Sequence, residues 1–351
     1  MNPLLDVRLL AVHAPITGGV LRDRVVDHRR VVDGVSLQIT RGGAYGLVGE
    51  SGSGASRVGR AVLRLVEPDG GRVLIDGVDV AQLHGKRLRA MRRRFQMVFP
   101  DPRSGLDPRR PVGALLAEAM RAHDLVDGVA DERLRSCAWA DAVGLPVAAL
   151  DRYPHELTDL QCRRVGIAAA LSVEPELLVA EEPVAALDVS GQAQVLNLLA
   201  QLRAEHALTL LVISRDLAVA AQVSDRIGVL YRGGLVEEGP TAELLHRPLH
   251  PYTRALLAAA AVADPDLADR RERIVLRADP DGADTAVAGC RFQPLCPWSR
   301  PARCAAERPP LRTLVGTGAE HRVACHHAEE IGREYWRQPR IPVPGGPSIA
   351  H

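Results

Sequence analysis

Apolar residues in the first part of the chain fall into short runs that predict two strands and a glycine-rich loop. Residues 31–51 read VVDGVSLQITRGGAYGLVGES, with a turn expected at residues 41–43 between the two runs. The second run, residues 44–49, leads directly into the loop GESGSGASR at residues 49–57. We therefore expect a buried strand that delivers the chain into this loop.

The residues after the loop predict a helix. Val58, Val62 and Leu65 recur at helical spacing, so a helix is expected over residues 55–68, ending at Pro68. A strand, a glycine-rich loop and a helix in this order are the setting of a phosphate-binding loop, because the loop amides and the helix N-terminus together attract an anion.

Two hairpins are predicted where turn residues separate short apolar runs. One covers residues 70–80, with Asp76–Gly77 at its turn, and the other covers residues 225–239, with Gly233–Gly234 at its turn. Both are expected to be antiparallel pairs of strands.

The middle of the chain alternates helical segments with fully apolar strands. Residues 111–170 predict mainly helix, and residues 191–206 predict an amphipathic helix. This second helix lies between apolar strands at residues 176–183 and 207–217. Such alternation is typical of a mostly parallel sheet covered by helices, so the expected fold class is α/β.

Composition narrows the range of functions. With 351 residues, the chain is long enough for one large α/β domain with an extension, or for two domains. Hydrophobic residues make up 46% and aromatic residues only 3%, and the net charge is near +1, which argues against a nucleic-acid binder. The sequence shows no secretory signal and no apolar run of 18 or more residues, so any membrane association is expected through a partner.

The loop at residues 49–57 matches the phosphate-binding pattern G-x-x-x-x-G-K-[ST] at every fixed position but one. Gly49, Gly54 and Ser56 match, and Ala55 stands where the pattern has lysine. Lys86 is the chain's only lysine, but a general exchange of lysine for arginine does not account for an alanine. The alternatives are a phosphate-binding loop that lost its lysine and a glycine-rich turn that only resembles one.

Four of the six cysteines crowd into the final quarter of the chain, spaced C-x5-C-x7-C-x20-C. Four thiolates suit a [4Fe–4S] cluster or a structural Zn²⁺, and free thiols are the third alternative. Cys137 and Cys162 are expected to be buried small hydrophobes, and His326 and His327 to be exposed to solvent. The candidate metal ligands are Cys290, Cys296, Cys304 and Cys325.

Seven segments, taken in order, resemble the ATP-binding subunits of ABC transporters, in particular those of oligopeptide and dipeptide importers. They read VDGVSL, GLVGESGSG, FQMVFPDPRSGLDPR, HELTDLQCRRVGIAAAL, PELLVAEEPVAALDVS, TLLVISRDLAVA and HPYTRALLAA. The resemblance implies a P-loop NTPase core of the ABC type, with an antiparallel β subdomain and a helical subdomain at about residues 95–165. It further implies a nucleotide-binding domain at residues 1–262, then a linker and Cys-rich C-terminal region at residues 263–351.

The resemblance makes the loop a phosphate-binding loop by descent. Without its lysine, the loop lacks a charge-assisted contact of about 1.5–3 kcal/mol. Ser56 aligns with the family's Mg²⁺-ligating serine, and Arg57 offers a cation whose side chain is expected to point elsewhere. The loop positions assigned to nucleotide are Gly49, Ser51, Gly52, Gly54, Ala55, Ser56 and Arg57.

Four further positions of the nucleotide site follow from the resemblance. Glu181 stands at the Walker B aspartate and is assigned to the metal, whereas Glu182 stands at the catalytic general base. Pro100 replaces the Q-loop glutamine and offers no side-chain amide, and Arg215 replaces the switch histidine that contacts the γ-phosphate.

The family's signature loop, LSGGQ, reads LTDLQ in this chain. Asp159 and Leu160 replace the two glycines, and both changes oppose binding of a phosphate held by a partner subunit. The D-loop keeps its aspartate, Asp188. The signature positions are Leu157, Thr158, Asp159, Leu160 and Gln161.

Together these features predict the ATP-binding subunit of a di- or oligopeptide importer, with nickel as an alternative cargo. The expected partners are two membrane permease subunits, an extracytoplasmic peptide-binding protein and a second ATPase subunit in a heterodimer, on the cytoplasmic face of the bacterial membrane. ATP/Mg²⁺ binding is expected to be weak or lost, and hydrolysis weak or absent. The family also implies an iron–sulfur cluster. The alternative function is a pseudo-ATPase that acts as a structural or redox-responsive subunit.

Overall fold

The computed structural model describes residues 3–18, 24–259, 274, 276, 288–314 and 320–335. The chain divides into two compact units, each assembled from separate stretches. The first unit comprises Met1–Leu10, Ser36–Ala44 and Ser56–Ile213, and the second comprises Ala11–Val35, Tyr45–Ala55 and Ser214–His351.

The N-terminal strands form a four-stranded antiparallel sheet of order β2-β1-β4-β5. In its predicted hairpin, Ile75 lies opposite Val78, and the turn residues Asp76 and Gly77 both have positive φ, as a two-residue hairpin turn requires. This confirms the hairpin expected at residues 70–80. The strands are β1 (Pro3–Gly18), β2 (Arg24–Thr40), β4 (Gly70–Ile75) and β5 (Val78–Asp79).

Three parallel strands of the first unit follow the order β8-β7-β6. Every residue of β7 and β8 is buried, which explains their continuous apolar sequences. Helix α6 (Val189–His206) joins β7 to β8 in the chain, so the predicted strand–helix–strand arrangement is confirmed. The strands are β6 (Phe95–Val98), β7 (Leu177–Glu181) and β8 (Thr209–Ser214).

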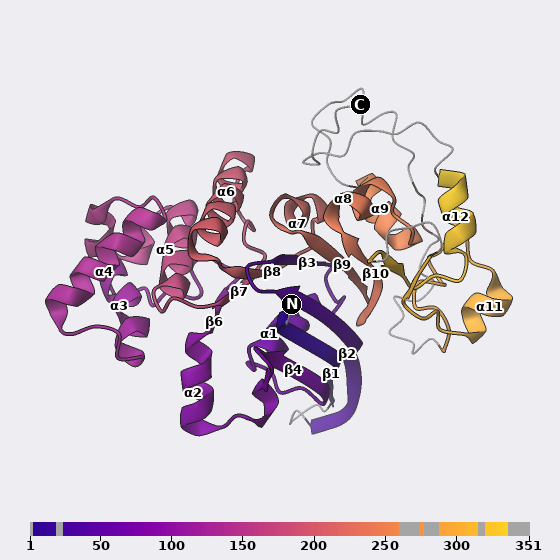
Figure 1. Ribbon diagram of the computed structural model, residues 1–351, viewed down its shortest axis with the longest axis horizontal. Coiled ribbons are helices and arrows are strands. Elements are labelled where there is room, and N and C mark those ends of the chain that lie inside the picture. The colour runs from indigo at the N-terminus through magenta and orange to yellow at the C-terminus, as the bar shows by residue number, and fades with distance from the viewer. Residues whose placement is uncertain are drawn as a thin grey trace. The chain divides into compact units, whose positions relative to one another are not determined.

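The residues between β6 and β7 form a helical subdomain in which α3, α4 and α5 pack against one another (Figure 1). This confirms the helices expected at residues 111–170. The α-helices are α3 (Val112–Ala122), α4 (Val129–Ala142) and α5 (Asp159–Leu171), with short 3₁₀ turns η2 (Val147–Asp151) and η3 (Pro154–Glu156). A further 3₁₀ turn, η1 (Val80–Gln82), and helix α2 (Gly85–Arg93) precede β6.

The helix after the glycine-rich loop, α1 (Ala55–Val62), is shorter than the predicted helix over residues 55–68. Arg64 adopts a left-handed φ of +50°, and the backbone N–H of Leu65 donates to the carbonyl of Arg60 at 2.8 Å. This is the hydrogen-bond pattern that ends a helix in a Schellman motif. The prediction was therefore wrong beyond Val62.

The side chain of Arg64 accounts for this early end. Its guanidinium is buried and donates to the carbonyl oxygens of Val80 and Leu83. These partners lie 16 and 19 residues further along the chain, so a local apolar pattern does not reveal them.

In the second unit, five strands follow the order β11-β12-β10-β9-β3, with β3 and β9 parallel and the other pairs antiparallel. Strand β3 (Ala44–Val48) confirms the second of the two strands predicted in residues 31–51, and β2 confirms the first. The remaining strands are β9 (Arg226–Tyr231), β10 (Gly234–Pro240), β11 (Arg312–Thr313) and β12 (Arg322–Val323). The helices are α7 (Leu217–Val223), α8 (Thr241–His246), α9 (Pro251–Ala259), α11 (Pro301–Ala306) and α12 (Ala328–Tyr335).

The hairpin between β9 and β10 turns one residue earlier than predicted. Tyr231 lies opposite Gly234, so Arg232 and Gly233 form the turn, with φ angles of +42° and +81°. Gly234 begins the next strand instead of lying in the turn.

The C-terminal region joins the second unit by adding a strand to its sheet. Val323 of β12 lies opposite Glu237 of β10, and Arg322 lies opposite Glu238. The predicted domain boundary at residues 262/263 and most of the linker that follows it lie outside the described residues. In the part of the chain that the structure describes, no helix has both the length and the apolar character needed to cross a bilayer.

Candidate functional site

The glycine-rich loop at residues 49–55 requires glycine at two positions. Gly52 and Gly54 have φ angles of +85° and +98°, in the left-handed region that other residues rarely adopt. A Cβ atom on Gly54 would lie 2.4 Å from the carbonyl oxygen of Val31. Gly54 of the phosphate-binding pattern and Gly52, at a variable position of the same loop, are thus fixed by the backbone itself.

Backbone hydrogen bonds hold this loop against two neighbouring segments of the second unit. The N–H of Gly49 donates to the carbonyl of Ser214 at 3.2 Å, and the N–H of Gly233 donates to the carbonyl of Ser53 at 2.7 Å. Arg215, the residue at the switch-histidine position, directly follows Ser214 and is exposed. The end of β8 therefore brings Arg215 beside the start of the loop.

Tyr252 also holds the loop, and the sequence analysis did not identify it. Its hydroxyl oxygen accepts a hydrogen bond from the N–H of Glu50 at 3.2 Å. The ring packs against Tyr231 and Phe292, with centroid distances of 4.7 Å and 5.5 Å. Burial raises the pKa of Tyr252, so the hydroxyl is neutral at physiological pH. Its place in the segment HPYTRALLAA was the one available signal.

Helix α1 begins at Ala55, whose side chain is only 5% exposed. The next residues, Ser56 and Arg57, are both exposed, as is Ser51 in the loop. A buried methyl group thus occupies the position at which the phosphate-binding pattern has a lysine.

The carboxylate at the Walker B position is paired within its own unit. Glu181 ends β7 with a side chain that is 4% exposed, and its Oε2 accepts from Nε and Nη2 of Arg60 at 3.4 Å and 3.3 Å. Arg60 lies one helical turn beyond Ser56 on α1, and the sequence analysis did not single it out. Since a buried carboxylate requires a partner, Arg60 supplies the cation that pairs with Glu181.

Glu182 and Asp188 lie on the segment between β7 and α6. Glu182 is half-buried and has a left-handed φ of +45°, and its N–H donates to the carbonyl of Ile213 at 2.8 Å. The side chain of Asp188 accepts from the N–H of Gly191 at 2.7 Å and so caps α6. A structural role at the helix start therefore accounts for Asp188.

The signature positions form the start of helix α5. Thr158 and Gln161 make a capping box, in which the N–H of each residue donates to the side-chain oxygen of the other at 3.0 Å and 3.2 Å. Leu157 is buried and Leu160 is half-buried. Asp159 lies on the first turn, where the helix dipole favours a negative charge.

The carboxylate of Asp159 pairs with an arginine that the sequence analysis did not identify. Nε of Arg103 donates to Oδ1 of Asp159 at 2.8 Å, and both side chains are partly exposed. The two residues are 56 positions apart in the sequence, so no local pattern predicts the pair. The negative charge at position 159 is therefore balanced inside the same unit.

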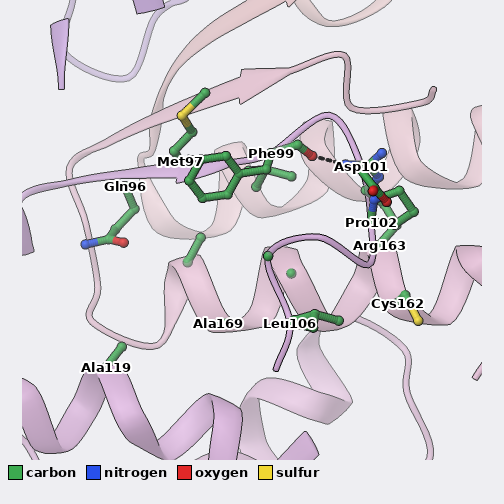
Figure 2. A pocket seen from close by; sticks show the side chains of 14 residues that line it. Gln96, Met97, Phe99, Asp101, Pro102, Leu106, Ala119, Cys162, Arg163 and Ala169 are labelled. Atoms are coloured by element: carbon green, nitrogen blue, oxygen red, sulfur yellow. Dashed lines mark hydrogen bonds between the residues drawn. The ribbon is translucent and has the colours of Figure 1, made fainter. Parts of the chain in front are cut away.

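Pro100 begins a segment that borders a cavity of 180 Å³ in the first unit (Figure 2). Gln96 lies on β6, and its side-chain amide donates to the carbonyl of Arg92 at 2.8 Å. Phe99 lies at the cavity with 43% of its surface exposed. The lining includes Met97, Phe99, Asp101, Leu106, Ala119 and Arg163.

All four C-terminal cysteines line one small apolar cavity of the second unit, with a volume of about 10 Å³. Burial raises the pKa of Cys325 to about 12 and also raises the pKa of Cys290, so both thiols carry protons at neutral pH. Over the described ranges, no group of three or more Cys, His, Asp or Glu is placed to hold a metal ion. The four thiols therefore line one cavity, but their side chains are not arranged as ligands of a metal ion. The cysteines are Cys290, Cys296, Cys304 and Cys325.

Two expectations about neighbouring side chains were wrong. His326 and His327 are half-buried and line the cysteine cavity instead of lying in solvent, and Nε2 of His326 lies 2.8 Å from the carbonyl of Glu307. Cys137, on α4, is only half-buried, whereas Cys162 is fully buried as expected.

Comparisons with known proteins match both the part of the chain that holds the glycine-rich loop and its C-terminal part to one family. A family model described as "ABC transporter" matches residues 32–185, and one described as "Oligopeptide/dipeptide transporter, C-terminal region" matches residues 236–304. A Brucella ovis protein named for peptide import and ATP binding is 45% identical over 314 residues, covering 89% of this chain and 95% of the relative. The chain belongs to the peptide-importer branch of the ABC ATP-binding proteins. This confirms the resemblance inferred from the seven sequence segments.

Other members of the branch match over a similar length. The oligopeptide transport ATP-binding protein AppF of Bacillus subtilis is 39% identical over 324 residues, which is 92% of this chain and 97% of the relative. The ABC fold is also found in a dimeric ATP-binding cassette solved with ADP and Pi, with a TM-score of 0.60 at 24% identity. That alignment covers 68% of this chain and 98% of the cassette. The predicted ABC-type fold class is therefore confirmed.

Proposed function

We propose that this chain is the ATP-binding subunit of a di- or oligopeptide importer, and that nucleotide occupancy instead of rapid hydrolysis couples it to transport. The relatives named for peptide import and oligopeptide transport support the proposal along nearly their whole length. The observation that carries it is the loop backbone at residues 49–55. This loop keeps its left-handed glycines although Ala55 occupies the lysine position.

Nucleotide phosphates would be bound mainly by backbone amides. Backbone N–H groups of a glycine-rich loop before a helix bind anions without a side-chain cation. Those of Gly49, Glu50 and Ser53 already donate within the protein, so the other amides of residues 51–56 would bind the phosphates. Ser56 and Glu181 are assigned to Mg²⁺, and Arg57 and Arg215 supply positive charge near the loop. Loss of the lysine contact lowers the expected affinity about 10- to 100-fold.

Hydrolysis is expected to be weak or absent because the groups that activate water are incomplete. Glu182 remains as the family's general base, but Pro100 has no amide to hold metal or water. Arg215 cannot exchange donor and acceptor roles as a neutral imidazole does. Glu181 is moreover engaged by Arg60.

Phosphate release by the purified chain tests this part of the proposal. Wild type and Glu182→Gln are expected to release phosphate at the same background rate. A wild-type rate that Glu182→Gln abolishes would show that the general base still works and would overturn the claim of weak hydrolysis.

A second, competent ATPase subunit is proposed as the head-to-tail partner. In such a pair, this chain's signature loop would face nucleotide bound to the partner. The carboxylate of Asp159 and the side chain of Leu160 then stand where the family's glycine amides approach the γ-phosphate. Turnover at that shared site is expected to be slow.

The 180 Å³ cavity is proposed as the contact site for a permease subunit on the cytoplasmic face of the membrane. The exposed ring of Phe99 gives the cavity an apolar contact, and the cavity lies within the helical subdomain proposed at about residues 95–165. This subdomain belongs to the proposed nucleotide-binding domain at residues 1–262. Residues 263–351 are proposed as the linker and Cys-rich region.

Co-purification with the two permease subunits tests this assignment. Phe99→Glu is expected to abolish co-purification, because it places a charge in an apolar contact. Val129→Glu is the matched control, since Val129 is 82% exposed on α4 and does not line the cavity. Equal recovery of both variants would contradict the assignment.

The cysteine cavity is proposed to bind a [4Fe–4S] cluster, with Zn²⁺ as the alternative. The convergence of four cysteines on one cavity supports this proposal, and metal binding would require loss of the thiol protons and movement of the side chains. Metal analysis of anaerobically purified protein is expected to find about four iron atoms per chain. One zinc would indicate the structural alternative, and an absence of both metals would leave free thiols.

The cysteine cavity also supports the alternative function, a pseudo-ATPase that acts as a structural or redox-responsive subunit. Gene context separates the two functions. Genes for permeases and an extracytoplasmic peptide-binding protein beside this gene are expected for the importer, whereas an isolated gene would favour the pseudo-ATPase.

A further inference from the structure

Two arginines of the first unit connect the signature loop, residues 157–161, with the segment at residues 99–106. Arg103 belongs to that segment, and its guanidinium donates to the signature loop and to Pro154, which lies three residues before it. Its Nη1 and Nη2 donate to the carbonyl oxygens of Pro154 and Leu157, both at 2.8 Å, in addition to the bond from Nε to Asp159. The planar guanidinium thus binds three acceptors around the start of α5.

Arg163 makes the reverse connection. It lies on α5, one turn after Asp159, and is only 1% exposed. Its Nη1 and Nη2 donate to the carbonyl oxygens of Phe99 and Pro100, the second at 2.5 Å, and Figure 2 shows Arg163 reaching this backbone from the helix. Burial lowers the pKa of Arg163, while nearby Asp101 favours its charged form.

The two sets of bonds are reciprocal. A side chain from each segment binds the backbone of the other, so neither segment can shift without breaking charge-assisted hydrogen bonds. Those made by Arg163 are shielded from water and are costly to break, because a buried cation without acceptors is strongly unfavourable. A glycine at position 159, as in the family's LSGGQ, would have no carboxylate to accept the hydrogen bond from Arg103.

We propose that Arg103 and Arg163 are positioning residues that hold the signature loop, residues 157–161, and the segment at residues 99–106 as one body. The cavity lies against this body, since Phe99, Asp101, Leu106 and Arg163 all line it. An occupant of the cavity therefore displaces the signature loop through the two arginines. That the occupant is a permease rests on the proposed function, but the connection itself does not.

A double-mutant cycle on the purified chain tests the connection, with amide hydrogen exchange measured segment by segment. Arg103→Ala and Asp159→Gly are each expected to speed exchange in both segments by about tenfold. The double variant is expected to be no faster than Arg103→Ala alone, because that variant has already lost the bond to Asp159. Arg109→Ala is the matched control, since Arg109 is 86% exposed and, among the residues that the structure describes, forms its ion pair with Asp107 of its own loop.

Transmission from the cavity is tested with a substitution that fills it. Ala119 lines the cavity from α3, outside both segments, so Ala119→Phe mimics an occupant without replacing either arginine. Exchange at residues 157–161 is expected to change in the wild-type background and not in Arg103→Ala. Arg163→Lys keeps the charge but cannot bind two carbonyl oxygens at once as the guanidinium does. It is expected to weaken the same response.

Two outcomes would overturn the proposal. One is additive effects of Arg103→Ala and Asp159→Gly, and the other is an Ala119→Phe response that persists without Arg103. Because these measurements use the isolated chain, a negative result would contradict the connection between the two segments alone. The importer assignment is tested separately, by co-purification with the permeases.

Discussion

At the scale of single residues, three substitutions in the nucleotide motifs are each satisfied by an arginine of the same unit. Arg103 pairs with Asp159, Arg60 pairs with Glu181, and Arg163 binds the carbonyl of Pro100. The guanidinium fork suits both carboxylates and adjacent carbonyls, which a lysine cannot match. These contacts stabilise the local structure, but none of them places a cation at position 55.

The pair formed by Arg60 and Glu181 gives a prediction about stability. In Arg60→Ala, the buried carboxylate loses its cation, and the free energy of unfolding is expected to fall by about 1–3 kcal/mol. Adding Glu181→Gln should recover part of this loss, because a neutral amide costs less to bury. Urea unfolding at pH 7 measures the effect.

Arg57→Ala is the control for this measurement. Arg57 is exposed on the same helix, and its removal is expected to change stability by less than about 0.5 kcal/mol. An Arg60→Ala variant as stable as this control would show that Arg60 does not support Glu181.

At the scale of elements, an ion-pair network joins four segments of the first unit. Arg94 and Arg41 both bind Glu176, which precedes β7, and both also bind Asp76 in the hairpin turn, at 2.8 Å and 3.2 Å. Hydrogen bonding from Arg94 lowers the pKa of Glu176 below its ordinary value of 4.5. The network therefore stabilises the fold only while Glu176 is ionised.

The sign of the pH dependence follows from this shift. The contribution of Glu176 is fully present above pH 4.5 and is lost as the pH falls through its lowered pKa, because the unfolded chain binds the proton more readily. Between pH 5 and pH 3, Glu176→Gln is expected to lose less stability than wild type. Glu205→Gln, an exposed change on α6, should follow the wild type, and identical slopes for all three proteins would contradict the prediction.

Elements were predictable where their determinants are local. The hairpin at residues 70–80 follows from two adjacent turn residues, and β7 and β8 follow from continuous apolar runs. The end of α1 was not predictable, because the guanidinium of Arg64 is held by distant carbonyls. The same reason applies at the candidate site. The motif positions were readable, but the arginines that bind Asp159, Pro100 and Glu181 lie 56, 63 and 121 residues away from them in the sequence.

At the scale of the whole molecule, the C-terminal region is tied to the core of the second unit through one buried carboxylate. Glu237 is fully buried and accepts from the N–H groups of Leu249 and His250 at 2.7 Å and 2.9 Å. Its Oε1 also lies 2.8 Å from Nε2 of His321, which directly precedes β12. This single side chain therefore joins β10, the start of α9 and the added strand.

Replacement of Glu237 by alanine tests this connection. Glu237→Ala removes the acceptor for three buried donors and is expected to destabilise the chain by about 3 kcal/mol, with faster amide exchange at Val323. Glu329→Ala removes a partly exposed carboxylate paired with Arg312, and is expected to cost less than about 1 kcal/mol. Equal effects would show that Glu237 has no special role in holding the C-terminal region.

The measurement that tests the account most directly is Mg-ATP binding by calorimetry, with wild type beside Ala55→Lys and Gly54→Val. Wild type is expected to bind, and Ala55→Lys to bind about 10- to 100-fold more tightly, because the missing charge-assisted contact is restored. Gly54→Val should not bind, since its side chain would collide with Val31. If neither wild type nor Ala55→Lys binds at millimolar nucleotide, the loop is no longer a nucleotide site and the proposed role in transport by occupancy is wrong.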